Sequence, residues 1–267
     1  MTDARIRELE RRWAETGAPE DESALVRARV QAGVVAREAL ALAAYCGSGV
    51  ALELGAAPAD PAGPQSWGVG LLRWGRTAPI RAVLSALGHA LRTLPERERS
   101  RVVPDNVVEG SLYPCARRAL GEVEGWVVQP GARTQQRVRR AGRDLERAST
   151  RLTQALNAQR AAARRADMRP VPDAWALLTT REQRIGQVAF ALRSCVAAVT
   201  NSAPHQLESL VGRAVSHAGF AVAEDADAAR RLAAQEVIAW ALGHRDPVRM
   251  RVGKRGETQI WPGDPIE

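Results

Sequence analysis

The sequence predicts an all-α protein, a multi-helix bundle of about nine or ten helices with a small N-terminal helical module. Alanine, the best helix former and a poor strand former, is the commonest of the 267 residues. Apolar residues recur every three or four positions, whereas the alternating pattern of half-buried strands is scarce. Hydrophobic residues make up 45% of the chain and charged residues 25%, which excludes a disordered or collagen-like chain.

Residues 1–55 are predicted to form the N-terminal helical module. Its first helix carries apolar residues on one face and ends at Gly17. A second helix begins near Pro19, where the acidic residues that follow suit the positive end of the helix dipole. Further helices are expected over about 35–46 and 50–54.

A larger helical bundle is predicted over 67–247, after a linker at 56–66 that contains three prolines and few side chains able to pack. The first helix of the bundle follows Thr77 and stops at Pro95. The later helices are expected near Asp105, over 114–128 and 134–166, from a capping box at Thr180 and Gln183, from Ser202 and Pro204, and from Asp225 or Asp227 to Gly243. The residues at 248–267 are predicted to form an extended or flexible tail.

The longest helical pattern covers 134–166. Its apolar residues alternate three and four positions apart, the heptad spacing of a helix that is packed along its length. They are Val138, Ala141, Leu145, Ala148, Leu152 and Ala155. This spacing permits packing within the chain or against a second copy, so it leaves the oligomeric state open.

The positive charge of the chain is concentrated in the same segment. Eleven arginines and three acidic residues lie between Arg133 and Arg169, a local charge of +8 that equals the formal net charge of the whole chain. The arginines on the flank and outer face of the predicted helix are Arg137, Arg140, Arg143, Arg147 and Arg151. One interpretation is a solvated helix face, since arginine replaces lysine everywhere except at Lys254. The other is a docking face for an anion-rich partner.

No linear motif identifies an enzyme, a metal site or a cofactor site. The scattered histidines form neither an H-x-x-x-H nor an H-E-x-x-H pair; they are His89, His205, His217 and His244. The cysteines form no C-x-x-C motif; they are Cys46, Cys115 and Cys195. We therefore expect no catalytic residue, no metal and no cofactor. An enzyme would need groups such as Asp246, His244 and a cysteine to converge in one cleft.

Seven tryptophans stand beside only two phenylalanines and two tyrosines. The tryptophans that lie in or next to apolar helical stripes are Trp13, Trp126, Trp175 and Trp240. Large rings fill the space that alanine leaves in a core, so we interpret these residues as core packing. The alternative is a platform on which the bases of a nucleic acid stack.

The sequence favours a cytoplasmic protein that spans no membrane. No uncharged apolar run reaches the length of about 18 residues that a membrane helix needs. The first residues are charged and lack the apolar region of a secretory signal. The three cysteines follow no disulfide pattern, as expected in a reducing compartment.

Two parts of the chain resemble known families of helical proteins. Residues 5–55 carry an acid–arginine first helix, a G-x-P-E-D turn at Gly17–Asp21 and the sequence LALAAYCG at 40–47. In these features the segment is similar to the repeat-companion domain, a short helical module at the N-termini of large bacterial paralogous families. The segments VEGWVVQPGARTQQRVRRAGR at 123–143 and WALGHRDPV at 240–248 resemble alanine-rich immunity proteins of polymorphic toxin systems. Both resemblances imply a partner-binding protein and supply no catalytic residue.

The function that the sequence favours is non-enzymatic protein binding. The arginine face over 137–151 would offer bidentate contacts to carboxylates of an acidic partner protein, whose identity the sequence leaves open. An immunity or antitoxin-like role is one concrete form of this function. The alternative is nucleic-acid binding by the same face without sequence readout, because no DNA- or RNA-binding motif accompanies it.

Overall fold

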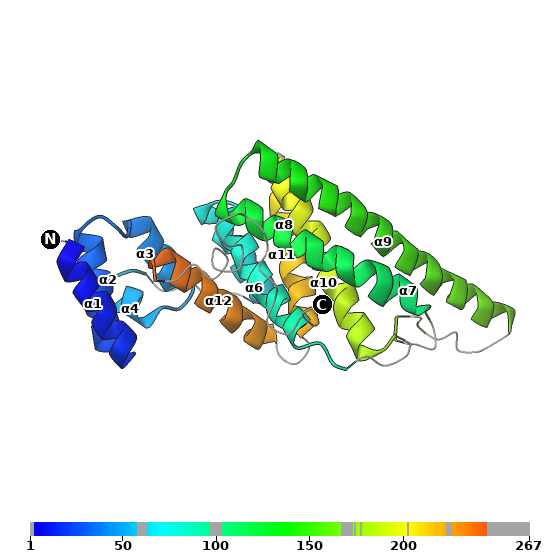
Figure 1. The fold of residues 1–267 in the computed structure, drawn as a ribbon, viewed down its shortest axis with the longest axis horizontal. Coiled ribbons are helices and arrows are strands. Elements are labelled where there is room, and N and C mark those ends of the chain that lie inside the picture. The colour runs from blue at the N-terminus through cyan, green and yellow to red at the C-terminus, as the bar shows by residue number, and fades with distance from the viewer. Residues whose placement is uncertain are drawn as a thin grey trace, which may run out of the picture.

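The computed structural model describes residues 3–57, 63–96, 103–166, 173, 175–176, 178–201, 203–222 and 226–244. These residues form helices and connecting turns, with no strand among them, so the all-α prediction is confirmed (Figure 1). In chain order the helical elements are α1 (Asp3–Thr16), α2 (Pro19–Gln31), α3 (Arg37–Tyr45), α4 (Gly49–Glu53), α5 (Pro64–Gly70), the 3₁₀ turn η1 (Leu71–Trp74), α6 (Thr77–Arg92), α7 (Asp105–Val107), the π-helical turn η2 (Val108–Leu112), α8 (Tyr113–Val128), α9 (Ala132–Arg165), α10 (Thr180–Thr200), α11 (Pro204–Val222) and α12 (Ala226–Ala241).

Helix α10 begins with a capping box one residue earlier than the sequence predicts. The Thr179 hydroxyl accepts a hydrogen bond from the backbone N–H of Glu182 at 3.2 Å, and the Glu182 carboxylate accepts one from the backbone N–H of Thr179 at 2.9 Å. The predicted pair of Thr180 and Gln183 is wrong, because Thr180 is already the first helical residue. A glutamate at the third helical position also suits the helix dipole better than the neutral glutamine.

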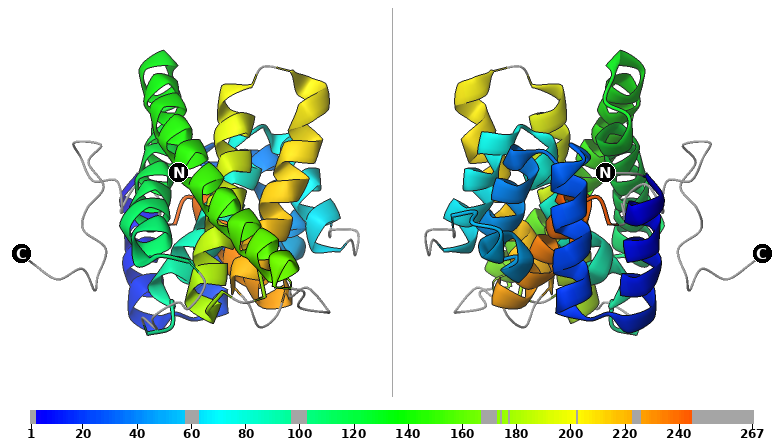
Figure 2. Two further views of the ribbon diagram at one scale, coloured as in Figure 1. Left: turned by 90° about the vertical axis from the view of Figure 1, so that its right-hand side faces the viewer. Right: turned by 90° about the vertical axis from the view of Figure 1, so that its left-hand side faces the viewer.

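Helix α10 lies at the centre of the main hydrophobic core. Helices α6, α8, α9 and α11 pack around it (Figure 2). Its apolar residues cover most of its circumference, as expected for a helix that is buried on several sides. The buried ones include Ile185, Val188, Ala189, Ala191, Leu192 and Cys195.

Helix α9 packs on this core through one stripe, as its heptad spacing predicts. The buried residues of the stripe are Val138, Ala141, Leu145, Ala148 and Leu152, and Ala155 is half-buried. Gly142 lies beside the stripe, where a Cβ atom would come within 2.5 Å of Cγ1 of Val196 on α10. The missing side chain therefore allows the two helices to approach closely. The C-terminal end of the helix extends past the rest of the bundle (Figure 1).

The N-terminal helices pack on the C-terminal end of α12, which also packs on α6 (Figure 1). Leu242, immediately after α12, is buried together with Val26, Leu40 and Ala43. Residues from the two ends of the chain therefore share apolar clusters, since Leu42 of α3 is also buried together with Val237 of α12. The boundary of the N-terminal module at residue 55 stays a prediction.

The predicted linker and tail lie mostly outside the described residues. Positions 58–62 and the whole tail at 248–267 are not among them. The last residues of the predicted linker are helical, because α5 begins at Pro64. Proline suits a first helical position, since its missing N–H would have no partner there.

A buried charged network joins α1, α2 and the end of α12. The Arg29 side chain, 6% exposed, donates hydrogen bonds to the Leu242 carbonyl at 2.9 Å and to Glu10 at 2.7 Å. The third partner of Arg29 is Nδ1 of His244, 3.0 Å away. The ring of His244 also packs 4.3 Å from the ring of Trp13, measured between centroids.

The contacts of His244 define its protonation state. Arginine can only donate, so Nδ1 of His244 accepts from Arg29 and carries no proton. Nε2 then bears the ring proton and donates to Glu22 at 2.9 Å. Burial, followed by the charge of Arg29, lowers the pKa of His244, while Glu22 and Glu10 act in the opposite direction.

The close approach of α9 and α10 predicts opposite effects for two glycine substitutions within helices. Gly142→Ala forces a methyl group against Val196, at a cost of about 1–3 kcal/mol that exceeds its gain in helix propensity. Gly125→Ala in α8 meets open space and should raise the free energy of unfolding by up to about 1 kcal/mol. Urea unfolding followed by circular dichroism measures both changes, and a stabilised Gly142→Ala variant would contradict the packing described here.

The neutral state of His244 predicts that stability falls as the pH drops through the pKa of histidine in the unfolded chain. Unfolding lets His244 bind a proton, so its contribution is full above about pH 6.5 and is lost below it, by at most about 1.4 kcal/mol per pH unit. His89 and His217 act with the same sign, because burial lowers the pKa of each.

Urea unfolding at pH 7.5, 6.5 and 5.5 tests the contribution of His244. His244→Gln keeps a donor for Glu22 and an acceptor for Arg29 but cannot be protonated. We expect this variant to show a shallower dependence of stability on pH than the wild type. The control is His205→Gln on the exposed surface of α11, which should leave the slope unchanged. Equal slopes for His244→Gln and the wild type would show that His244 does not carry the effect.

Candidate binding surface on α8 and α9

The five arginines predicted to bind a partner are all exposed on α9, on the sides that face away from α10 or toward α8. Arg140 and Arg143 make no ion pair with any residue that the structure describes, and Arg147 has a side chain that is 73% exposed. The opposite stripe of α9 is buried in the main core. The helix therefore presents these charges on a backbone that its own packing holds in place.

Part of this charge is engaged within the fold. Nε of Arg137 pairs with Glu122 on α8 at 2.7 Å, and Nη2 of Arg147 pairs with Asp144 one turn earlier on α9 at 2.6 Å. Arg151 donates a longer hydrogen bond, 3.4 Å, to the hydroxyl of Ser111 in η2. These contacts hold three of the five arginines against α8, η2 or α9 itself.

Packing adds a sixth arginine that the sequence analysis missed. Arg118 of α8 is 68% exposed and lies 3.6 Å from Asp144, so this carboxylate is shared by Arg118 and Arg147. Only the contact between α8 and α9 brings Arg118 to the site, because it is far from the basic segment in the chain. We call this set of six the α8/α9 arginine surface: Arg118, Arg137, Arg140, Arg143, Arg147 and Arg151.

The α8/α9 arginine surface is a mosaic of both signs with a positive excess. Six guanidinium groups share it with two carboxylates, those of Glu122 and Asp144. Guanidinium groups offer planar pairs of donors that match carboxylates and phosphates. Because the side chains are exposed, their ion pairs contribute little to stability and can exchange partners.

The cysteines do not supply a ready nucleophile at neutral pH. Burial raises the pKa of both the Cys46 and the Cys195 thiol to about 12, and burial also raises the pKa of half-buried Cys115 at the edge of the arginine surface. An active site was predicted to need Asp246, His244 and a cysteine in one cleft, and of these Asp246 lies outside the described residues. His244 contacts Trp13, Glu22 and Arg29 rather than a cysteine.

The described residues contain no cluster of three or more histidine, cysteine or acidic side chains that could hold a metal ion.

The tryptophans predicted to pack in the core are indeed buried or half-buried: Trp13, Trp126, Trp175 and Trp240. They therefore do not form an exposed platform for nucleic-acid bases.

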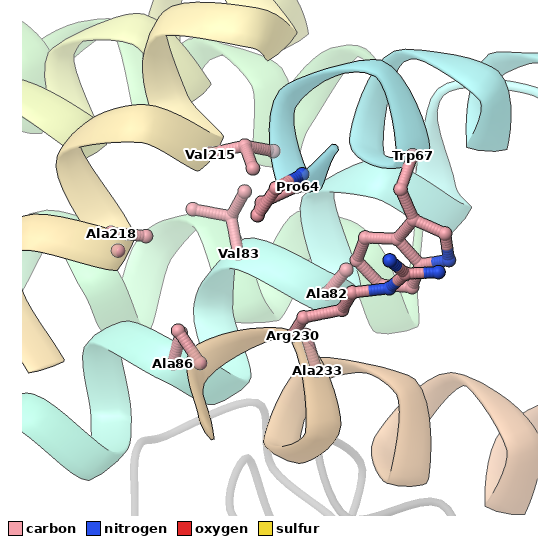
Figure 3. Close-up of a pocket in the computed structure, with 11 residues that line it drawn as sticks. Pro64, Trp67, Ala82, Val83, Ala86, Val215, Ala218, Arg230 and Ala233 are labelled. Carbon is pink, nitrogen blue, oxygen red and sulfur yellow. The ribbon is translucent and has the colours of Figure 1, made fainter. Parts of the chain in front are cut away.

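An apolar pocket lies between α5, α6, α11 and α12 (Figure 3). Small side chains such as Ala82, Ala86 and Ala218 line it, and the guanidinium of Arg230 stacks over the ring of Trp67 at 5.5 Å. Its volume is about 20 Å³, which is room for one water molecule. The pocket is therefore a packing gap in this conformation rather than a ligand site.

A larger and more polar groove lies along α10 between α9 and α11. Its volume is about 430 Å³. Helix α9 contributes Gly142 and Glu146 to one side, and α11 contributes Leu210, Arg213 and His217 to the other. The Arg193 side chain crosses the floor and forks onto Glu146, with Nη2 and Oε1 2.7 Å apart.

None of the helices that the structure describes combines the length and the apolar character needed to span a bilayer. Comparison of the chain with models of protein families, with curated proteins and with solved structures finds no match.

Proposed function

We propose that this protein is a non-enzymatic binding protein whose α8/α9 arginine surface docks a partner protein with an acidic surface. The observation that carries the proposal is the pair Arg140 and Arg143, exposed on a firmly packed helix and without an ion pair to any described residue. An uncompensated charge on a rigid helix speeds association with an acidic partner and orients it. An immunity or antitoxin-like role in the cytoplasm is one concrete form of this function.

The mixed charge of the surface favours a protein partner over a nucleic acid. The phosphates of a duplex are uniformly negative, so Glu122 and Asp144 would repel them. A protein partner can place its own basic residues opposite these two carboxylates and its acidic residues opposite the arginines. The acidic residues then select the register of the complex, because a shifted partner would meet like charges.

Reversing the charge of the surface should abolish partner capture. We expect Arg140→Glu with Arg147→Glu to lower capture at least tenfold, since both positions would then repel carboxylates instead of binding them. The measurement is affinity capture from a lysate of the native host, with wild type and variant side by side and quantification by mass spectrometry. The purified captured protein is then titrated against both forms by calorimetry.

The matched control is Arg5→Glu with Arg27→Glu. These exposed arginines lie on α1 and α2, at the far end of the molecule from the surface, and the substitutions change the net charge by the same amount (Figure 1). Circular dichroism verifies that both double variants remain helical. The proposal fails if the wild type and the Arg140/Arg147 variant retain the same proteins, or if the control loses them equally.

A salt titration with labelled duplex DNA separates the two classes of partner. Arg140, Arg143 and Arg147 lie close together, whereas Arg164 lies about 30 Å farther along the helix axis. A straight duplex crossing α9 therefore does not reach both ends of the helix. Of the six arginines of the surface, only Arg140 and Arg143 have no partner among the described residues, so we expect a log–log slope of affinity against salt of about −2. A slope near −5 in fluorescence anisotropy would mean contact with five or six phosphates, and nucleic acid would replace protein as the proposed partner.

A further inference from the structure

Helix α11 carries two exposed side chains that the fold does not use: Arg213 lines the groove between α9, α10 and α11, and Phe220 lies on the same helix beyond the lining residues. Arg213 is exposed and makes no ion pair with the residues that the structure describes. Phe220 has the most exposed large apolar side chain among them, at 68%. Arg213, His217 and Phe220 follow one another at i, i+4 and i+7 on α11, so they lie on one face of that helix.

The other charged groups of the groove are already satisfied. The carboxylate of Glu146 is held by two nitrogens of Arg193, which neutralises both. His217 is 2.7 Å from the side-chain oxygen of Gln187, and its ring packs 5.5 Å from that of Phe190. Burial, with the nearby charge of Arg213, lowers the pKa of His217, so its ring is neutral at pH 7. The unbalanced charge in the groove is therefore the positive charge of Arg213.

The arrangement of helices around the groove leaves room for one more helix to pack there. Helices α9 and α11 both pack against α10, and residues of α10 line the groove between them. The floor includes the short side chains of Ser194 and Ala197, over which another helix can approach. The groove combines polar and apolar lining, as in complexes where an amphipathic helix lies in a groove.

We infer that this groove receives one acidic amphipathic helix of the partner protein, with a carboxylate on Arg213 and an apolar side chain against Phe220. The inference rests on the proposed function and adds a second contact on the opposite flank of α9. Glu146 faces the groove and reaches α10, whereas Arg137 faces the arginine surface and reaches α8. A partner that occupies both flanks holds α9 between its two contacts.

A designed peptide tests the groove in the full-length protein. The probe is a fluorescein-labelled 20-residue helical peptide with leucine on one face and glutamate on the flanks. One control peptide has the same composition with the leucines spread around the helix, and the other has lysine in place of glutamate. By fluorescence anisotropy we expect the probe to bind at least tenfold more tightly than either control peptide.

Variants of the protein locate the binding site. Arg213→Glu and Phe220→Ser should each weaken the probe at least tenfold, and Arg27→Glu, which changes the net charge as Arg213→Glu does, should leave it within about twofold. Circular dichroism and thermal unfolding verify that each variant folds. Equal binding by the wild type and the two groove variants, equal loss in Arg27→Glu, or no preference among the peptides would overturn the inference.

Partner capture separates this inference from the proposed function. If Arg140→Glu with Arg147→Glu abolishes capture while Arg213→Glu and Phe220→Ser retain it, the arginine surface docks the partner and the groove inference is wrong. If the groove variants lose capture and the arginine-surface variant retains it, the groove inference stands and the arginine surface is not the docking site. If sedimentation velocity shows a wild-type dimer that Phe220→Ser makes monomeric, the occupant is a second copy of the chain, and the inference is wrong.

Discussion

The burial of α10 on several sides is the constraint from which the rest of the structure follows. A helix with apolar residues around most of its circumference needs neighbours on each of those sides, and α6, α8, α9 and α11 supply them. Each neighbour then has to bury only one stripe of its own. For α9 that stripe is the alanine- and leucine-rich heptad series, and the remainder of its surface stays in water. The arginines are exposed because α9 lies at the periphery of the bundle. Their positions are fixed because the apolar stripe on the opposite face of α9 is buried in the core.

Close approach between helices has a direct consequence for the candidate sites. Gly142 brings α9 against Val196 of α10, and both residues line the groove, so this contact sets how closely α9 approaches α10 there. The fork between Arg193 and Glu146 spans the same pair of helices at the surface. The apolar contact determines the separation of the helices, and the ion pair is compatible with it, since exposed ion pairs alone contribute little free energy.

The N-terminal helices are attached by a buried polar network as well as by apolar contacts. Their apolar contact with α12 is accompanied by the buried side chains of Arg29 and His244. A buried guanidinium is tolerated only when its donors are satisfied, and here Glu10, the Leu242 carbonyl and His244 all accept from it. Such a network is sensitive to the loss of one partner, because the remaining charge would be buried without compensation. It therefore specifies one orientation of the N-terminal helices more strictly than an alanine-rich apolar contact could.

Local spacing alone determined the helical class, most helix positions and the buried stripe of α9, because these depend on residues three or four positions apart. The capping box of α10 depends on more than local spacing. Threonine occupies both 179 and 180, and the side chains three residues later, Glu182 and Gln183, both fit the pattern. Only the path of the backbone before α10 decided which pair is used.

The tertiary structure alone decided which charges are engaged and which are available. Arg137 is paired because Glu122 lies opposite it on α8, and Arg118 joins the surface by the same packing. The partners of His244 lie more than 200 residues earlier in the chain, so no sequence window contains them. Arg213 and Phe220 are ordinary residues of an amphipathic helix until α9 and α10 complete a groove beside them. Electrostatic partners and grooves depend on distances in space between separate helices, whereas the periodicity of the sequence reports only on the helix that carries it.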